Sequence, residues 1–276
     1  MDRRSMLAAC AAAATALAGC SASPNDGDTA RPSPGTPTST PTPTTATDST
    51  PLAVRSVDAP GTVELGKPYT VGFAVENPTD GERTLETPVS VRARGEWRPF
   101  TSISARVPPG STTVEREFAA PRFLGTYRFR LQEPTAEWRI EATERRLAFG
   151  EPFTTPQNLS LVVLGGRFTD AYDAGGNSTV TPPPDRQFLL VRVRLENPTG
   201  GSVTLPPLGA FQVRAGDGTY QVALNDPGQR VSVESGNRKR IELPFLVPGS
   251  VSAADVAVRW APRYRPGRTV VVWRRE

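Results

Sequence analysis

The chain has 276 residues with 32 basic and 28 acidic side chains, and its net charge of +4 is too small for a typical nucleic-acid-binding protein. It contains no histidine, which removes the commonest general base and metal ligand and excludes a Ser–His–Asp triad. Its 24 glycines and 29 prolines argue against a mostly helical fold, because both residues weaken helix interiors.

Residues 1–19 are typical of an export signal. Arg3 and Arg4 precede the apolar run 6–18, which is shorter than the about 20 residues that cross a membrane and suits the core of a signal peptide. The Arg-Arg pair followed by Ser-Met-Leu resembles a twin-arginine export signal, and Leu-Ala-Gly-Cys ending at Cys20 resembles the lipobox of prokaryotic lipoproteins. The resemblance implies cleavage before Cys20 and lipidation of its sulfur. The alternative is an uncleaved N-terminal anchor.

Residues 20–51 are predicted to form a disordered linker that starts at the lipidated Cys20. Of the 31 residues from Ser21 to Pro51, 9 are Thr, 7 are Pro and 5 are Ser. Such a segment buries too little apolar surface to offset the entropy of ordering its chain. It acts either as a spacer that lifts the following domains off the membrane or as a passive tether.

From Leu52 onward the dominant pattern is alternation of apolar and polar residues. The runs 69–75 and 189–195 place apolar side chains at every second position, which is the period of a half-buried strand. Turns rich in Gly, Pro and Asn separate such runs. The best helix candidate is 135–146, although Trp138, Ile140 and Ala142 also fit a strand. The pattern predicts an all-β protein with antiparallel strands.

A motif recurs within this region. The sequence Val-Glu-Asn-Pro-Thr-Asp-Gly ending at Gly81 returns as Leu-Glu-Asn-Pro-Thr-Gly-Gly ending at Gly201, 120 residues later. An alternating strand runs into both copies. The echo predicts two copies of one domain type, over residues 52–143 and 144–276, because a period this long exceeds that of solenoid repeats. The alternative is that Asn-Pro-Thr turns simply recur in β proteins.

These landmarks resemble known modules. Residues 52–143, with the Glu-Asn-Pro-Thr turn and the Gly-Thr-Tyr strand at Gly125, resemble prokaryotic immunoglobulin-like or fibronectin-like domains. Residues 144–276, with Phe149-Gly150 and the Asp-Gly-Thr-Tyr hairpin at Asp217, resemble telokin-like immunoglobulin-fold domains. The resemblance implies two β-sandwiches and carries no catalytic residues. The whole chain resembles a haloarchaeal surface lipoprotein, although such proteins are usually strongly acidic and this one is not.

We therefore expect a non-enzymatic lipoprotein on the outer face of the cytoplasmic membrane, acting as an interaction or scaffolding module with an envelope protein or glycan as partner. We expect no cofactor, no metal site and no nucleic-acid partner. The alternative is a glycan-binding or small-molecule-binding module. For this alternative the aromatic platform would come from the four tryptophans, Trp97, Trp138, Trp260 and Trp273, which otherwise pack in the core.

Residues 144–276 carry 17 basic and 12 acidic side chains, a net charge of +5. Much of the excess comes from six arginines near the C-terminus, namely Arg259, Arg263, Arg265, Arg268, Arg274 and Arg275. One interpretation is that this end of the chain binds an acidic glycan, an S-layer or a lipid surface. The other is that these arginines lie on a solvated strand face and tail.

Two Asn-x-Ser/Thr sequons are candidate glycosylation sites, at Asn158 and Asn177. Asn177 lies in a Gly-rich loop and is the better acceptor. The same loop holds Asp170 and Asp173, whose oxygens could ligate calcium, but their spacing lacks the EF-hand pattern and a solvated hairpin loop is the alternative.

Overall fold

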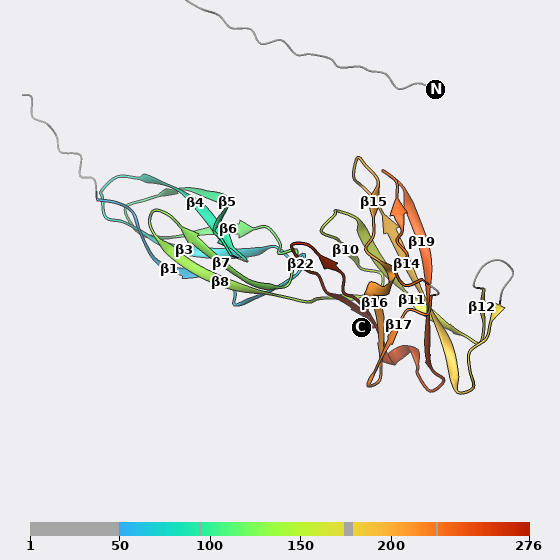
Figure 1. Ribbon diagram of the computed structural model, residues 1–276. Helices are drawn as coiled ribbons and strands as arrows, with labels where there is room; N and C mark the ends of the chain where they lie inside the picture. Colours follow the sequence, from blue (N-terminus) through green and yellow to red (C-terminus); the bar gives the residue numbers. More distant parts are fainter. Residues whose placement is uncertain (1–49, 94, 174–178, 225) are drawn as a thin grey trace, which may run out of the picture. The chain divides into compact units, whose positions relative to one another are not determined.

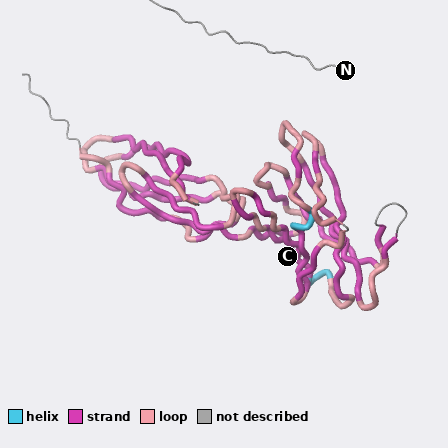
Figure 2. Tube along the Cα trace, viewed as in Figure 1, coloured by secondary structure: helices cyan, strands magenta, loops and turns pink. Residues whose placement is uncertain are grey.

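The computed structural model describes residues 50–93, 95–173, 179–224 and 226–276 (Figure 1). The prediction of an all-β protein is confirmed. Strands and turns dominate the described residues, with two short 3₁₀ turns, η1 (Leu208–Ala210) and η2 (Ala253–Asp255) (Figure 2). The segment for which a helix was the alternative contains strand β8 (Ala136–Thr143). All described residues fall in one compact unit.

Two sheets enclose the first hydrophobic core. The smaller has three strands in the order β1 (Ala53–Asp58), β3 (Tyr69–Asn77) and β6 (Gly110–Phe118). The larger has five strands in the order β2 (Thr62–Glu64), β8, β7 (Gly125–Leu131), β4 (Arg83–Arg92) and β5 (Arg98–Val107).

Two further sheets enclose the second core. One has four strands in the order β10 (Pro152–Thr154), β11 (Ser160–Thr169), β14 (Arg186–Glu196) and β19 (Arg238–Pro248). The other has five strands in the order β17 (Gly218–Gln221), β16 (Phe211–Ala215), β20 (Val256–Trp260), β23 (Val271–Arg274) and β9 (Arg145–Ala148).

Three short two-stranded ribbons complete the described strands. They are β12 (Tyr172–Asp173) with β13 (Thr179–Val180), β15 (Val203–Thr204) with β18 (Ser232–Val233), and β21 (Arg263–Tyr264) with β22 (Gly267–Arg268).

The two five-stranded sheets repeat one arrangement. In each, the first strand in the chain (β2 or β9) pairs in parallel with the last (β8 or β23), and the remaining pairs are antiparallel. The partner sheets also correspond, since β1-β3-β6 matches β11-β14-β19. They differ in chain order, because β1 precedes β2 whereas β9 precedes β11. The two pairs of sheets therefore share one strand order.

A buried asparagine holds the first copy of the recurring motif. The side chain of Asn77 is buried, and its Nδ2 donates to Gly81 O at 2.8 Å and to Val107 O at 3.0 Å. Its Oδ1 accepts from Thr79 twice, from the backbone N–H at 3.1 Å and from the hydroxyl at 2.7 Å. One side chain therefore closes the turn and ties it to the end of another strand.

Asn197 makes the same bonds in the second copy. Its Nδ2 donates to Gly201 O and Val233 O, both at 2.7 Å, and its Oδ1 accepts from the backbone N–H and the hydroxyl of Thr199 at 3.0 and 2.7 Å. The two motifs are thus the same structural device, which chance recurrence of an Asn-Pro-Thr turn would not require.

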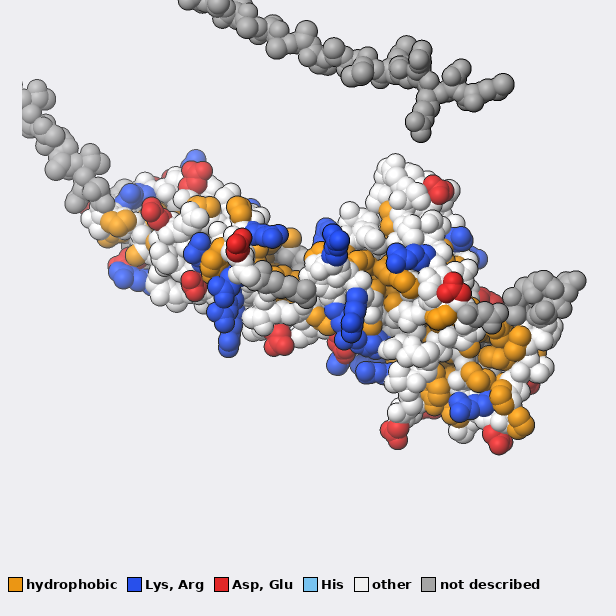
Figure 3. Space-filling view, in the orientation of Figure 1, with side chains coloured by type: hydrophobic (Ala, Val, Ile, Leu, Met, Phe, Trp, Pro, Cys, Tyr) orange, Lys and Arg blue, Asp and Glu red, His pale blue; other side chains and the backbone are white. Residues whose placement is uncertain are grey.

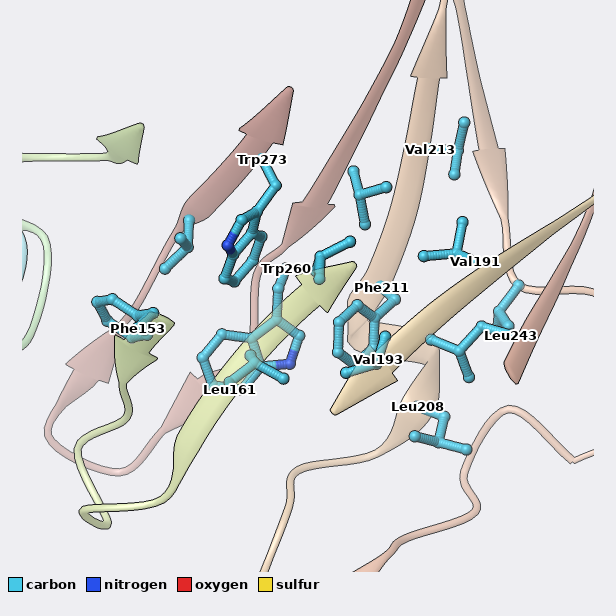
Figure 4. Packing of buried hydrophobic residues seen from close by; sticks show 14 of the residues in the cluster. Phe153, Leu161, Val191, Val193, Leu208, Phe211, Val213, Leu243, Trp260 and Trp273 are labelled. Atoms are coloured by element: carbon cyan, nitrogen blue, oxygen red, sulfur yellow. The ribbon is translucent and has the colours of Figure 1, made fainter. Parts of the chain in front are cut away.

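The alternation seen in the sequence corresponds to burial. In β3 the side chains of Tyr69, Val71, Phe73 and Val75 are all at most 8% exposed, while those between them face outward. The buried hydrophobic residues form two clusters. The larger one, around Trp260 in the second pair of sheets, is shown in part in Figure 4.

A tyrosine hydrogen bond at the start of β7 fits the predicted sandwich type. The hydroxyl of Tyr127 donates to Phe123 O, four residues upstream, at 2.8 Å. A tyrosine near the start of this strand that bonds to upstream backbone is a hallmark of immunoglobulin-like sandwiches.

Candidate functional site

Most of the residues predicted to act in export or modification lie outside the described part of the chain. This applies to Arg3, Arg4, Cys20 and Asn177. The other sequon asparagine, Asn158, is exposed on a turn with a positive φ of 63°. No helix among the described residues is long and apolar enough to span a membrane. Within the same residues, no three His, Cys, Asp or Glu side chains gather as metal ligands would.

Three of the four tryptophans are buried, so they cannot form the aromatic platform of a glycan-binding site. Trp260 and Trp273 are fully buried, and Trp138 is only 8% exposed. Trp260 and Trp138 alternate with less buried residues on β20 and β8, and Trp273 belongs to a run of three buried residues on β23. Their faces are occupied by core packing and cannot stack on a sugar. Only Trp97 is partly exposed, and the guanidinium of Arg130 lies 4.5 Å from its ring centroid.

The strongest charged feature is the outer surface of the second five-stranded sheet. Val213, Val258 and Trp273 face the core, so the residues that alternate with them face outward. We call the resulting set of basic residues the outer arginine face. It comprises one residue from each of four strands, with one more from the β21–β22 ribbon, namely Arg146, Arg214, Arg259, Arg274 and Arg268.

Strand register brings these residues together. Val272 on β23 lies between Arg259 and Arg146, and Ala257 on β20 lies between Arg214 and Arg274. Small or apolar residues therefore separate the arginines, and no carboxylate intervenes. Figure 3 shows basic side chains gathered where Figure 1 places β22 and the C-terminus.

Arg259 is the half-buried centre of this face. Its Nη1 donates to Gln212 Oε1 at 2.8 Å, and its buried Nε has no hydrogen-bond partner among the described residues. Burial lowers the pKa of Arg259, and the charges of Arg268 and Arg214 lower it further, against the opposing effect of Glu144. The contributions of Arg268 and Arg214 reflect positive charge close to this guanidinium.

Little negative charge balances the face. Glu144 pairs with Arg146 at 3.2 Å. Among the described residues, no other ion pair involves a member of the outer arginine face. Guanidinium groups with free donors bind carboxylate, phosphate and sulfate oxygens, often through two parallel hydrogen bonds. The surface can therefore hold a polyanion.

The sequence identified only part of this face. Of the six C-terminal arginines named in the sequence analysis, three belong to the face: Arg259, Arg268 and Arg274. Arg263 and Arg265 are exposed in the β21–β22 region, and Arg275 lines a separate cavity of about 230 Å³. Sequence reasoning missed Arg146 and Arg214. The alternation in their own strands marks them as outward-facing, but only sheet register places them beside the others.

The sheets and their packing define a β-sandwich protein. No family model matches the chain, and no curated protein is significantly similar to it. Solved structures resemble it only distantly. An uncharacterized β-sandwich protein from Clostridium difficile 630 aligns with 11% identity and a TM-score of 0.34, over 49% of this chain and 97% of that one.

Two further similarities have lower scores. Escherichia coli alpha-2-macroglobulin activated by porcine elastase aligns with 11% identity and a TM-score of 0.25, over 82% of this chain and 22% of that one. The calcium-binding domain CBD12 of CALX1.1 aligns with 12% identity and a TM-score of 0.22, over 75% and 78% of the two chains. Similarity at this level concerns the fold alone.

Proposed function

We propose that the chain is a non-enzymatic surface lipoprotein, anchored to the outer face of the cytoplasmic membrane through Cys20, whose β-sandwich region is an interaction module of the envelope. Its outer arginine face binds an acidic envelope polysaccharide. The observation that carries this proposal is the concentration of five arginines, centred on Arg259, with one paired carboxylate among them.

The rest of the sequence agrees with this role. The twin-arginine-like start would direct export, and the lipobox-like motif would provide the lipid anchor. The Thr/Pro-rich segment 21–51 would act as a long linker between the membrane and the β-sandwich region. At about 3.1 Å per residue, a fully extended linker of this length spans roughly 95 Å. An anchored module on such a tether can contact a polymer well above the membrane.

The double variant Arg214→Gln/Arg274→Gln is expected to weaken binding of the whole protein to polygalacturonate by about tenfold or more. The reason is that hydrogen bonds to charged groups each contribute about 1.5–3 kcal/mol. Binding is measured by biolayer interferometry with the protein in lipid nanodiscs at about 0.1 M salt. Neutral dextran serves as the uncharged polymer, and binding should fall steeply as salt shortens the screening length.

The matched control is Arg194→Gln/Arg240→Gln, which removes the same charge from a cross-strand pair on the other sheet of the same sandwich. This control should leave polygalacturonate binding nearly unchanged. Equal losses in the two double variants would mean that only net charge matters, and the proposed face would be wrong.

The anchor has its own test. Cys20→Ser is expected to leave an unprocessed precursor or to release the protein into the medium, because the sulfur that carries the lipid is gone. Cell fractionation and the size of the protein on a gel report the outcome, with Ser21→Ala as the matched control. Unchanged membrane retention and unchanged precursor processing in the Cys20→Ser variant would contradict the lipoprotein assignment.

A further inference from the structure

An apolar cavity lies at one end of the first sandwich. Its volume is about 270 Å³, slightly below the usual range for small-molecule sites. Aromatic rings dominate its wall and come from three strands and from the β6–β7 connection. The residues used below are Tyr69, Phe100, Arg122, Phe123, Tyr127 and Phe129.

Phe100 presents an exposed aromatic ring at this cavity. It is the extra residue of a bulge, since Ser90 pairs with Pro99 and Val89 with Thr101. Its ring is 39% exposed, one of two large hydrophobic side chains that are exposed in the described part of the chain. Exposed apolar surface at a concave site favours a ligand that covers it.

Phe100 is also the outermost ring of an aromatic stack. It is nearly parallel to Phe118, with centroids 6.0 Å apart, and Phe118 is stacked on Tyr69 at 5.6 Å. Phe129 meets Phe100 edge-on at 5.5 Å. A further planar ring in the cavity would extend this stack in the offset or edge geometries that aromatic groups prefer.

Two polar groups in the cavity wall would orient a bound ligand. Tyr69 lines the cavity, and burial together with Tyr127 raises the pKa of its hydroxyl, which therefore remains a donor. Arg122 is exposed in the cavity wall and forms no ion pair with any described residue; its Nη1 donates to Pro156 O at 3.1 Å. A hydroxyl donor and a cation in an otherwise apolar wall match a ligand that has a flat apolar body and an anionic end.

We propose that this cavity binds a planar aromatic carboxylate, with its ring against Phe100 and its carboxylate hydrogen-bonded by the Tyr69 hydroxyl and Arg122. This site requires neither the lipid anchor nor the outer arginine face. It would make the first sandwich a small-molecule receptor beside the polymer-binding surface of the second.

The probe is 2-naphthoate, titrated by isothermal calorimetry into the full-length protein in lipid nanodiscs, with empty nanodiscs as the blank. We expect saturable binding that weakens about tenfold in Tyr69→Phe, because a hydrogen bond to a charged group is lost. Arg122→Gln should have a similar effect, and Phe100→Ala should also weaken binding by removing the stacking ring.

Tyr264→Phe is the matched control. Its hydroxyl is buried without a hydrogen-bond partner among the described residues and lies outside this cavity, so the variant should bind 2-naphthoate as the native protein does. Cyclohexanecarboxylate, which has the charge but no aromatic ring, should bind at least tenfold more weakly. If Phe100→Ala unfolds, Tyr69→Phe still provides the test, since it removes a single oxygen atom.

Three results would overturn the proposal. They are no saturable binding of 2-naphthoate, equal binding of the ring-free acid, and equal affinities of the native protein and Tyr69→Phe.

Discussion

Trp260→Ala is expected to lower the free energy of unfolding by about 3–5 kcal/mol, the usual cost of truncating a large buried aromatic residue. Trp260 is fully buried, with its ring 6.1 Å from Phe211 and 6.2 Å from Phe153. Figure 4 shows it among Leu161, Phe211 and the other labelled core residues. Removing the indole leaves a cavity that rigid neighbouring strands cannot fill. Urea denaturation followed by circular dichroism measures the loss.

Two variants sharpen this test. Trp260→Phe should cost much less than Trp260→Ala, because it keeps a ring in the core and removes an indole N–H that has no hydrogen-bond partner. Trp97→Ala should cost under about 1 kcal/mol, since this tryptophan is partly exposed. A similar cost for Trp97→Ala and Trp260→Ala would contradict the inward placement of Trp260.

The second large effect is expected for Asn197→Ala, which should lower the free energy of unfolding by about 3 kcal/mol. The amide of Asn197 satisfies two backbone carbonyls, Gly201 O and Val233 O, and Val233 is buried. Alanine leaves both acceptors without this donor and frees the turn that Thr199 closes. Chemical denaturation of the variant and the native protein gives the difference.

The first copy of the Asn-Pro-Thr motif supplies a matched comparison. Asn77→Ala should destabilise the first sandwich by a similar amount, because its bonds to Gly81 and Val107 have the same pattern. Asn237→Ala, an exposed asparagine in the same sandwich as Asn197, should change stability by less than about 0.5 kcal/mol. A negligible cost at Asn77 or Asn197 would show that these turns do not depend on the buried amide.

Much of the fold follows from the sequence because strand burial has a period of two. The run 69–75 predicted a half-buried strand, and β3 buries every second side chain there. The segment 135–146 was ambiguous, since its apolar residues fit either a helix or a strand. Pairing of β8 with β7 and β2 decides for the strand. β7 is its hairpin neighbour, but β2 is distant in the sequence.

The repeated Asn-Pro-Thr motif shows how much of the tertiary structure a local sequence pattern can predict. The recurrence indicated two related turns, and the structure gives both the same hydrogen bonds. The sequence did not indicate that the asparagine amide is buried and bonded to a strand end 30 or 36 residues away. That bond depends on how the chain returns past the turn.

The sequence by itself determined the alternation of strands and turns and the absence of histidine chemistry. The tertiary structure alone decided which tryptophans face the core and which arginines share a surface. Arg146 and Arg214 join Arg259 through register across β9, β23, β20 and β16. The physical reason is that alternation sets the face of each side chain within one strand, whereas its neighbours are set by pairing between distant strands.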